Sequence, residues 1–433
     1  MYAEPKTVLK NYFGYDSFKK GQREVINSIL QGQDTFTIMP TGGGKSLCYQ
    51  LSSLLLDGIT LVISPLISLM KDQVDALTSD GIKAAYINSS LSVTGIQQRL
   101  DGVRRGRYQL LYVAPERLES RYFLQLLKKL EIALIAVDEA HCVSQWGHDF
   151  RPDYLNITKI FDREVEAEKP LIAAFTATAT PEVRDDVIKI LSLQEPFIFT
   201  GDIKRKNLTL KVRKVLSKDR FLIKYIVNNK NKCGIIFAST RKEVERINNL
   251  LKQKGYQTDR YHAGLTNSER KRVQELFIQN KIKIIVATNA FGMGIDKHNV
   301  RYIIHNNIPG DLESYYQQAG RAGRDGKPGE CILLYSNFDY QKKKFLIKNG
   351  NSKETRKKYK LNKLKSIFDY CHTGKCLQQY IIKYFSEEKY IKNFNNTNQC
   401  FNCSNCLGKQ GFSNKIIYIF SFFINIFLKL KNR

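Results

Sequence analysis

The 433 residues contain no uninterrupted run of about 18 apolar residues, the length that a membrane-spanning helix requires. The first residues, Met1 to Lys6, do not begin the apolar stretch of a secretory signal. These absences argue against a membrane-spanning or secreted protein. We therefore expect no membrane association and a location in the cytoplasm.

Acidic residues are few compared with basic ones: 41 Asp and Glu stand against 69 Lys and Arg, a net charge of +28. Residues 341–433 hold 20 Lys and Arg but 4 Asp and Glu, so +16 of the excess lies there. Such a basic block is typical of proteins with a polyanionic partner. A solvated, Lys-rich surface is the alternative interpretation. The 42% share of hydrophobic residues is enough for a core, which argues against a disordered or fibrous protein.

A secreted disulfide framework is also unexpected, because the nine cysteines are an odd number without a secretory signal. Cys400, Cys403 and Cys406 form a CxxCxxC run, and Cys376 lies 24 residues before its first member. Four thiolates suit tetrahedral Zn²⁺, although the same spacing also serves an iron–sulfur cluster. Free thiols in a loose tail are the third interpretation.

Two stretches of the chain alternate short, apolar, β-branched segments with helical patterns, as buried parallel strands and their crossover helices do. This predicts an α/β fold with parallel-sheet domains at 1–203 and 204–340, joined near 201–207. Lys-rich helical patterns and clustered Cys predict a small helical metal-binding module at 341–407, followed by an atypical hydrophobic and basic tail at 408–433. The expected strands are 35–39, 60–63, 110–113, 134–137 and 171–175, then 234–237, 282–286, 302–304 and 331–335.

A glycine-rich segment, residues 39–46, follows the first expected strand and precedes a helical pattern. Glycines allow backbone N–H groups to surround phosphates, and the positive end of the next helix faces the same point. Lys45 would contact the β- and γ-phosphates, and the hydroxyl of Ser46 would bind Mg²⁺. A chance glycine-rich turn is the alternative, which the strand–loop–helix context disfavours.

Asp138 and Glu139 follow the apolar strand 134–137, at the edge where open α/β sheets bind ligands. Asp138 would hold Mg²⁺, and Glu139 would orient and deprotonate the attacking water. A surface carboxylate pair at a strand end is the alternative. The phosphate-binding loop in the same domain makes it the weaker one.

The segment from Ser144 to Arg151 contains the only Trp of the chain, Trp146, together with His148 and Phe150. Aromatic faces accept unstacked bases without reading sequence, and Arg adds phosphate contact. This predicts an accessible nucleic-acid-binding loop directly after the catalytic carboxylates. The alternative is that Trp146 and Phe150 are core residues.

In the second expected domain, Arg321 and Arg324 lie three residues apart in Gly320–Gly326. On a helix, residues at this spacing share a face, and a guanidinium stabilises charge on a transferring phosphoryl group. A solvated basic helix is the alternative, which is disfavoured once the nucleotide site is considered.

The phosphate loop and the Asp-Glu-Ala-His sequence at 138–141 resemble superfamily 2 helicases. The segment from Cys142 to Tyr154 resembles the aromatic-rich loop of the RecQ family of ATP-dependent DNA helicases, and similar segments extend to Cys406. The resemblance implies two RecA-like domains, a zinc-binding module rather than an iron–sulfur one, and Cys376 as the fourth zinc ligand. It also implies that Arg324 is an arginine finger with Arg321 beside it.

The resemblance further implies the residues that contact nucleotide and DNA. Tyr15 would stack on adenine, Gln22 would bond its edge, and Lys19 stands where the family has Arg. Gln318 stands where the family has Glu. Beside these, the implied ATP contacts are Thr41, Gly42, Gly43, Gly44, Lys45, Ser46 and Asp296. The implied DNA contacts are Gln145, Trp146, His148, Phe150, Arg151, Thr240 and Arg241.

The function implied is a 3′–5′ DNA helicase of recombination and repair that uses ATP, Mg²⁺ and Zn²⁺. It would bind single-stranded DNA and fork or duplex junctions as a monomer, with a single-strand binding protein as a candidate partner. A bacterial protein of this kind would lie at the nucleoid. The family usually continues into a winged-helix domain, whereas the tail 408–433 lacks that pattern, which we interpret as truncation. Two alternatives remain: an RNA helicase, and a nucleic-acid-binding protein with a decayed motor.

Overall fold

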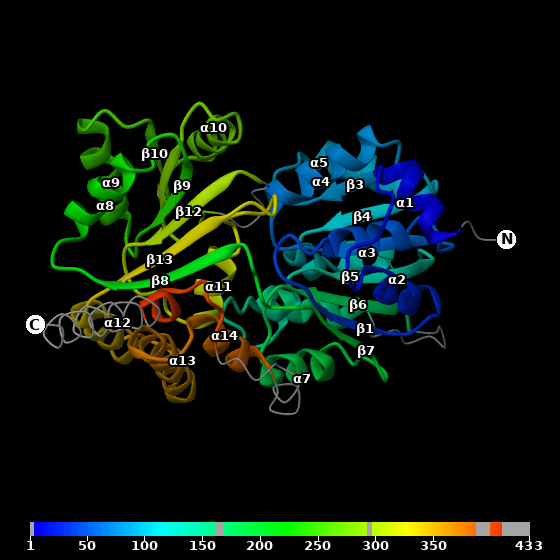
Figure 1. Ribbon diagram of the computed structural model, residues 1–433. Helices are drawn as coiled ribbons and strands as arrows, with labels where there is room; N and C mark the ends of the chain where they lie inside the picture. The colour runs from blue at the N-terminus through cyan, green and yellow to red at the C-terminus, as the bar shows by residue number, and fades with distance from the viewer. Residues whose placement is uncertain (1–3, 128, 161–168, 292–296, 387–398, 409–433) are drawn as a thin grey trace, which may run out of the picture. The chain divides into compact units, whose positions relative to one another are not determined.

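The computed structural model describes residues 4–127, 129–160, 169–291, 297–386 and 399–408 (Figure 1). The described residues form two compact units, the first ending at Ile203 and the second beginning at Lys204. Each unit is an α/β layer structure with its own parallel sheet. The expected fold class is therefore confirmed.

Within the described residues, the first sheet has seven strands in the order β3-β4-β2-β5-β6-β1-β7, and every neighbouring pair is parallel. The strands are β1 Thr35–Ile38, β2 Ile59–Ile63, β3 Ala84–Ile87, β4 Leu110–Val113, β5 Ile132–Val137, β6 Leu171–Thr176 and β7 Phe197–Thr200. The α-helices are α1 Pro5–Phe13, α2 Gln22–Leu30, α3 Lys45–Ser52, α4 Ile67–Ser79, α5 Val93–Arg104, α6 Arg121–Leu127 and α7 Pro181–Ile190. Three 3₁₀ helices are η1 Pro115–Glu119, η2 Ala140–Val143 and η3 Pro152–Ile160.

The central strands of this sheet are apolar on both faces because helices cover both faces. In β5, Ile135 and Val137 belong to the core on one face of the sheet, and Leu134 and Ala136 belong to the core on the other. Successive side chains of a strand point to opposite faces, so a continuous apolar run fills two cores at once. This strand carries the predicted catalytic carboxylates at its carboxyl end.

The second sheet has six described strands in the order β10-β11-β9-β12-β13-β8, again parallel throughout. They are β8 Leu208–Lys214, β9 Cys233–Phe237, β10 Thr258–Tyr261, β11 Ile284–Ala287, β12 Val300–His305 and β13 Gly329–Tyr335. The helices are α8 Lys218–Val227, α9 Arg241–Gln253, α10 Asn267–Ile278, α11 Leu312–Ala319, α12 Asn337–Lys348, α13 Glu354–His372 and α14 Leu377–Phe385.

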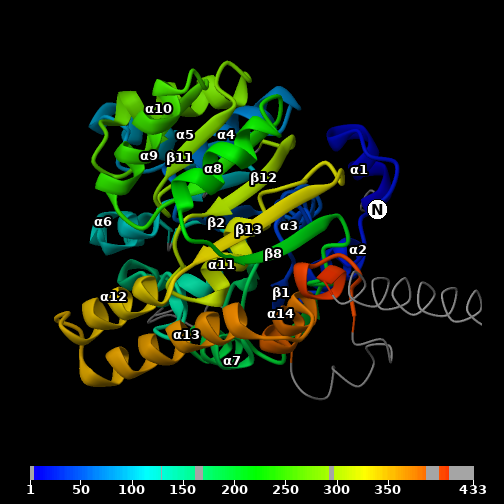
Figure 2. The ribbon, with the colours of Figure 1, turned by 60° about the vertical axis from the view of Figure 1, so that its left-hand side comes forward.

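Helices α12, α13 and α14 belong to the second compact unit, on the side of its sheet where β8 lies (Figures 1 and 2). The described cysteine segment, 399–408, is part of the same unit.

Among the described residues, no helix is both long enough and apolar enough to cross a bilayer.

Asp34, just before β1, ties together three separate segments of the first unit. Its carboxylate accepts hydrogen bonds from the backbone N–H groups of Ile172 and Gln194, both at 2.8 Å, and from Nζ of Lys169 at 3.2 Å. Asp34 is buried, so water cannot easily replace these bonds.

We predict that Asp34→Ala lowers the free energy of unfolding by roughly 2–4 kcal/mol, because buried backbone donors lose a charged acceptor. Urea unfolding monitored by circular dichroism measures this change. Asp16→Ala is the control, because the ion pair of Asp16 with Lys10 is exposed and contributes little. Equal destabilisation by the two variants would contradict the role given to Asp34.

Candidate nucleotide and nucleic-acid site

The glycine-rich segment forms the turn between β1 and the start of α3, as predicted from the sequence. Gly42 and Gly44 have φ angles of +84° and +83°, a left-handed conformation that glycine adopts without strain. The N–H of Gly43 donates to the carbonyl of Pro40 at 2.8 Å, which closes the turn. The loop therefore leads into α3 with its backbone exposed to a phosphate at the positive end of that helix.

The two side chains of this loop that would contact phosphate and Mg²⁺ are held from within the first unit. Nζ of Lys45 donates to the carbonyl of Met39 at 3.1 Å. The hydroxyl of Ser46 accepts from Nε2 of Gln73 at 3.2 Å. Gln73, in α4, is not among the predicted nucleotide contacts, because only the fold brings it to the loop.

The segment expected to recognise adenine lies against the same loop. Nε2 of Gln22 donates to the carbonyls of Gly43 (3.4 Å) and Gly44 (3.2 Å), and its Oε1 accepts from the N–H of Lys19. Nζ of Lys19 donates to the carbonyl of Gly42 at 3.1 Å. Tyr15 is exposed, as a stacking residue must be. Gln22 would have to exchange these bonds to reach the edge of a base.

Asp138 and Glu139 follow β5 at the same edge of the sheet as the loop after β1. The N–H of Asp138 donates to the carbonyl of Ile63 in β2 at 2.9 Å, and its Oδ1 accepts from the N–H of Glu139 at 3.0 Å. Glu139 has a φ of +48°, a left-handed conformation that costs a non-glycine residue energy. The hydroxyl of Tyr154 donates to the carbonyl of Asp138 at 2.9 Å, which braces the strained turn.

Burial and the neighbouring Glu139 carboxylate raise the pKa of Asp138 to about 7, and the charge of Lys45 opposes this rise. Two adjacent carboxylates in a buried site disfavour their joint ionisation. A divalent cation relieves that repulsion, so this donor set fits Mg²⁺ held by Asp138 and the hydroxyl of Ser46. Mg²⁺ would supply charge neutralisation for the phosphates there.

His141 joins the carboxylate pair to the carboxyl end of β6, and its site role was not predicted. Its Nδ1 lies 2.9 Å from Oγ1 of Thr176 and 3.4 Å from Oε2 of Glu139. Burial, with the nearby charges of His148 and Arg151, holds the pKa of His141 well below its usual range. The imidazole is therefore neutral and connects the two segments by hydrogen bonding. The sequence signal was the His of Asp-Glu-Ala-His, but its partner lies 35 residues away.

The aromatic loop is folded tightly onto the turn after β5. His148 stacks on His141, with ring centroids 4.2 Å apart. A Cβ at Gly147 would lie 2.1 Å from the carbonyl oxygen of His141, so only glycine fits there. Gln145 is exposed, whereas Trp146 and Phe150 are partly buried, and Trp146 packs against one of the two sheet cores. The loop thus combines a packed side with a solvent-facing side.

Arg151, at the end of this loop, is fixed by two contacts. Its Nε and Nη2 donate to Oδ2 of Asp149 at 3.1 and 2.9 Å, and its Nη1 donates to the carbonyl of Pro65 at 3.2 Å. Pro65 lies between β2 and α4, so Arg151 joins the end of the aromatic loop to the segment that follows β2.

In the second unit, the helical prediction for Arg321 and Arg324 was wrong. Helix α11 ends at Ala319, and both arginines lie in the turns that follow. Gly320 is the C-cap of α11, and the N–H groups of Arg321 and Ala322 donate to carbonyls three residues earlier, in tight turns. The left-handed Gly323, with a φ of +57°, follows these turns. Arg321 is buried and Arg324 half-buried, so neither belongs to a solvated basic helix.

Thr240 and Arg241 begin α9 at the carboxyl end of β9. Thr240 is exposed, and its hydroxyl caps the helix by accepting from the N–H of Glu243 at 3.2 Å. The guanidinium of Arg241 lies over Gly264, since a Cβ there would be 3.2 Å from Nη1. Asp296, the remaining predicted ATP contact, lies outside the described residues.

The four predicted zinc ligands come together in the second unit. The Sγ atoms of Cys376, Cys400, Cys403 and Cys406 all lie within 4.8 Å of one another. Tetrahedral Zn²⁺ with Zn–S bonds of about 2.3 Å requires sulfur atoms about 3.8 Å apart, so the group fits the metal. Zn²⁺ would cross-link these segments here.

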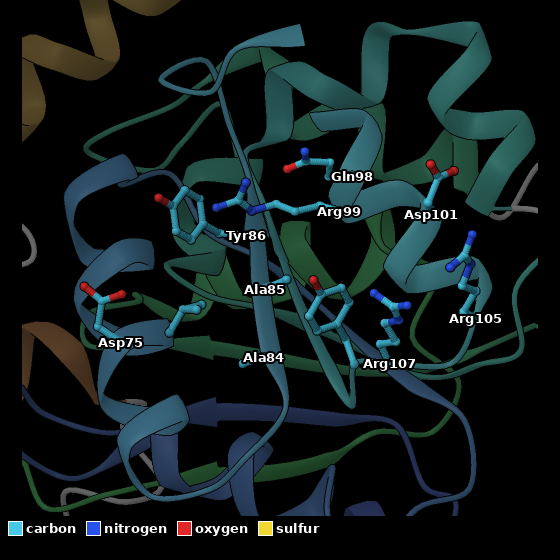
Figure 3. Close-up of a pocket in the computed structure, with 11 residues that line it drawn as sticks. Asp75, Ala84, Ala85, Tyr86, Gln98, Arg99, Asp101, Arg105 and Arg107 are labelled. Carbon is cyan, nitrogen blue, oxygen red and sulfur yellow. The ribbon is translucent and has the colours of Figure 1, made fainter. Parts of the chain in front are cut away.

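A separate cavity of about 590 Å³ lies beside the edge strand β3, between α4 and α5 (Figure 3). Arg99 extends over the ring of Tyr86 there, with its guanidinium carbon 4.8 Å from the ring centroid. The residues that line this cavity are outside the predicted site set.

Three family models match successive parts of the chain. They are the DEAD/DEAH box helicase model at residues 19–187, the helicase conserved C-terminal domain at 217–326, and the RecQ zinc-binding model at 338–407. The ATP-dependent DNA helicase RecQ of Bacillus subtilis is 50% identical over 408 residues, which cover 94% of this chain and 67% of that protein. The chain belongs to the RecQ family of ATP-dependent DNA helicases. The RecQ zinc-binding match and the four-cysteine cluster together bear out the expected zinc cofactor.

A second RecQ, from Pasteurella multocida, is 42% identical and is covered over 62% of its length. The chain thus spans about two thirds of the length of these curated relatives. Among solved structures, yeast Dbp5 bound to RNA and ADP BeF₃ matches 89% of this chain and 98% of its own, with a TM-score of 0.63 and 17% identity. That likeness supports the helicase fold alone.

We predict that Cys403→Ala abolishes zinc binding and lowers the unfolding temperature, because removal of one thiolate opens the tetrahedral site. Cys371→Ala is the matched control, because Cys371 is also buried in this part of the chain but is not one of the four clustered thiols. Atomic emission measures the metal, with one zinc per chain expected for the native protein and the control. Retention of zinc by Cys403→Ala would contradict the assignment.

Proposed function

We propose that this chain hydrolyses ATP to move 3′ to 5′ along single-stranded DNA and to unwind forks and duplex junctions during recombination and repair. The observation that carries this proposal is that the chain is continuous between the carboxylate turn and the aromatic loop. The turn that bears the carboxylates Asp138 and Glu139 runs directly into the aromatic loop, and His148 stacks on His141. A base bound at the loop would thus act on the same rigid turn that holds the attacking water.

The proposed chemistry uses side chains of the first unit for binding and proton transfer. Lys45 leaves its bond to Met39 and binds the γ-phosphate, and Ser46 and Asp138 provide oxygen ligands for Mg²⁺. Glu139 accepts a proton from water as the water oxygen bonds to the γ-phosphorus. The bond to the β-phosphate oxygen breaks, and ADP and phosphate leave. Arg321 and Arg324 stabilise the charge on the transferring group.

DNA contact would work by stacking and by charge. We assign Gln145, Trp146, His148, Phe150 and Arg151 to one strand-binding surface, and Thr240 and Arg241 to another. The first motor domain would be 1–203, the second 204–340 with Asp296 near the nucleotide, and the zinc module 341–407.

The remaining parts of the proposal concern the setting of the protein. We propose a monomer in the cytoplasm, at the nucleoid in a bacterial cell, with single-strand binding protein as a partner. Sedimentation of the chain with and without that protein tests both the monomer and the interaction.

The central test is ATP hydrolysis with and without a single-stranded DNA oligonucleotide. We predict that Lys45→Ala and Glu139→Gln each lower the DNA-stimulated rate by at least about 100-fold, through loss of phosphate neutralisation and of the base respectively. Lys271→Ala, which removes an exposed lysine of α10 that pairs with Glu275 and is outside the predicted site residues, is the control and keeps the native rate. An RNA oligonucleotide that stimulates as well as DNA, or full activity of Lys45→Ala, would overturn the proposal.

We also predict that Trp146→Ala separates the two activities. Basal hydrolysis without DNA stays near the native rate, whereas stimulation by DNA falls about tenfold, because one stacking contact contributes roughly 1–3 kcal/mol. Steady-state rates across a DNA titration measure both values. Tyr122→Ala, which removes an exposed aromatic residue outside the predicted site, is the control. Equal loss of basal and stimulated rates would show that Trp146 acts only in packing.

A further inference from the structure

The turns that carry Arg321 and Arg324, here called the finger loop (residues 320–329), are held by a residue that no site motif includes. Arg205 lies just before β8, and its guanidinium donates to three carbonyls of the loop. Nη1 donates to Gly320 at 3.4 Å, and Nη2 donates to Ala322 at 3.2 Å and to Gly323 at 3.0 Å. One planar group thus binds backbone on both sides of Arg321.

Asn207 holds the same loop from two residues further on. Its Nδ2 donates to the carbonyls of Gly323 at 2.8 Å and Lys327 at 2.9 Å, and its own carbonyl accepts from the N–H of Gly329 at 2.9 Å. A Cβ at Gly323 would lie 2.5 Å from this Nδ2, so the left-handed glycine is what admits the amide. The conformation of the finger loop and the side chain of Asn207 therefore depend on each other.

The cysteine segment binds the other side of the same stretch. Nδ2 of Asn402 donates to the carbonyls of Lys206 at 3.2 Å and Leu208 at 3.3 Å. Its Oδ1 accepts from the hydroxyl of Thr209 at 2.7 Å, and Cys403 forms a β-bridge with Leu210. Asn402 and Cys403 lie inside the CxxCxxC run, so a metal on the thiolates fixes these contacts.

Burial of the charged guanidinium of Arg205 costs free energy, which a purely structural contact would not require. It is half-buried, and burial, with the nearby charge of Arg324, lowers its pKa. A lysine ammonium cannot span three carbonyls as a planar guanidinium does. This free-energy cost is consistent with a need to hold a loop in one conformation for catalysis.

We propose that Arg205 and Asn207 are positioning residues that set the finger loop, and that the zinc-bound cysteine segment holds them in place through Asn402. The proposal rests on the function given above to Arg321 and Arg324, and adds the residues through which the zinc module acts on them. The chain of contacts runs from Cys403 and Asn402 to residues 205–210, and from there to residues 320–329.

The test uses the full chain with bound zinc. We expect Arg205→Lys to lower the kcat of DNA-stimulated ATP hydrolysis by about 10- to 100-fold, as displaced catalytic groups do. The KM for ATP, the zinc content and the unfolding temperature stay near native values. Arg213→Lys, an exposed arginine on β8, is the matched control and keeps the native rate.

Hydrogen exchange supplies a readout that is independent of activity. Amides of residues 320–329 should exchange faster in Arg205→Lys and in Asn402→Ala, with zinc retained in both. The double variant Arg205→Lys/Arg324→Ala should be no slower than Arg324→Ala alone, because both changes remove one function.

The outcomes separate this inference from the proposed function. If Arg324→Ala keeps native hydrolysis, the proposed role of the finger loop fails. If Arg324→Ala is impaired but Arg205→Lys matches the native protein in kcat and exchange, only the positioning role fails. Additive losses in the double variant would likewise overturn it.

Discussion

Parallel strand pairing is the constraint on which the candidate site of the first unit depends. Because all seven described strands run the same way, the loops after β1, β5 and β6 leave the sheet at one edge. The strand β6 lies between β1 and β5, so its carboxyl end, at Thr176, lies between the phosphate loop and the carboxylates. The hydrogen bond from His141 to Thr176 follows directly from that strand order.

Burial then gives these loops their chemistry. Asp138 is nearly inaccessible beside Glu139, which raises its pKa and makes a cation favourable. His141 is buried and neutral, so its hydrogen bonds fix the positions of the segments that it contacts but add no charge to the site. Tyr154 and the left-handed Glu139 hold the turn in a conformation that costs energy. The apolar cores on both faces of the sheet supply the stability that permits such a turn.

Sequence patterns predicted the central strands well because these are buried on both faces and therefore apolar throughout. The four strands that the sequence analysis missed, β3, β7, β8 and β10, are the described edges of the two sheets. β10 lacks an apolar run because it carries Thr258, Asp259 and Arg260, and β8 alternates apolar with polar residues from Leu208 to Lys211. β3 and β7 are largely apolar but are four residues long, which gives a weak signal. The helical prediction for Arg321 and Arg324 failed for a different reason, because α11 ends at Ala319, with Gly320 as its C-cap, before either arginine.

Sequence patterns could not predict contacts between residues that lie far apart in the chain. Gln73 reaches Ser46 and Arg205 reaches Gly320 only after the sheets have formed. The CxxCxxC spacing predicted a metal site locally, but the ligand at Cys376 came from family resemblance and the role of Asn402 from the fold.

The edge strand β8 shows why the cysteine segment is located where it is. An uncovered parallel edge exposes unpaired backbone groups that invite association with other chains. Asn402 and the Leu210–Cys403 bridge cover the start of this edge, and Ser404 accepts from the N–H of Val212 at 3.4 Å. A metal-bound segment can do this with few apolar residues, because the ligand bonds supply the ordering that a core would otherwise provide. The same contacts of the cysteine segment with β8 leave Arg205 and Asn207 facing the finger loop. Protection of the sheet edge and positioning of the finger loop therefore depend on the same segment.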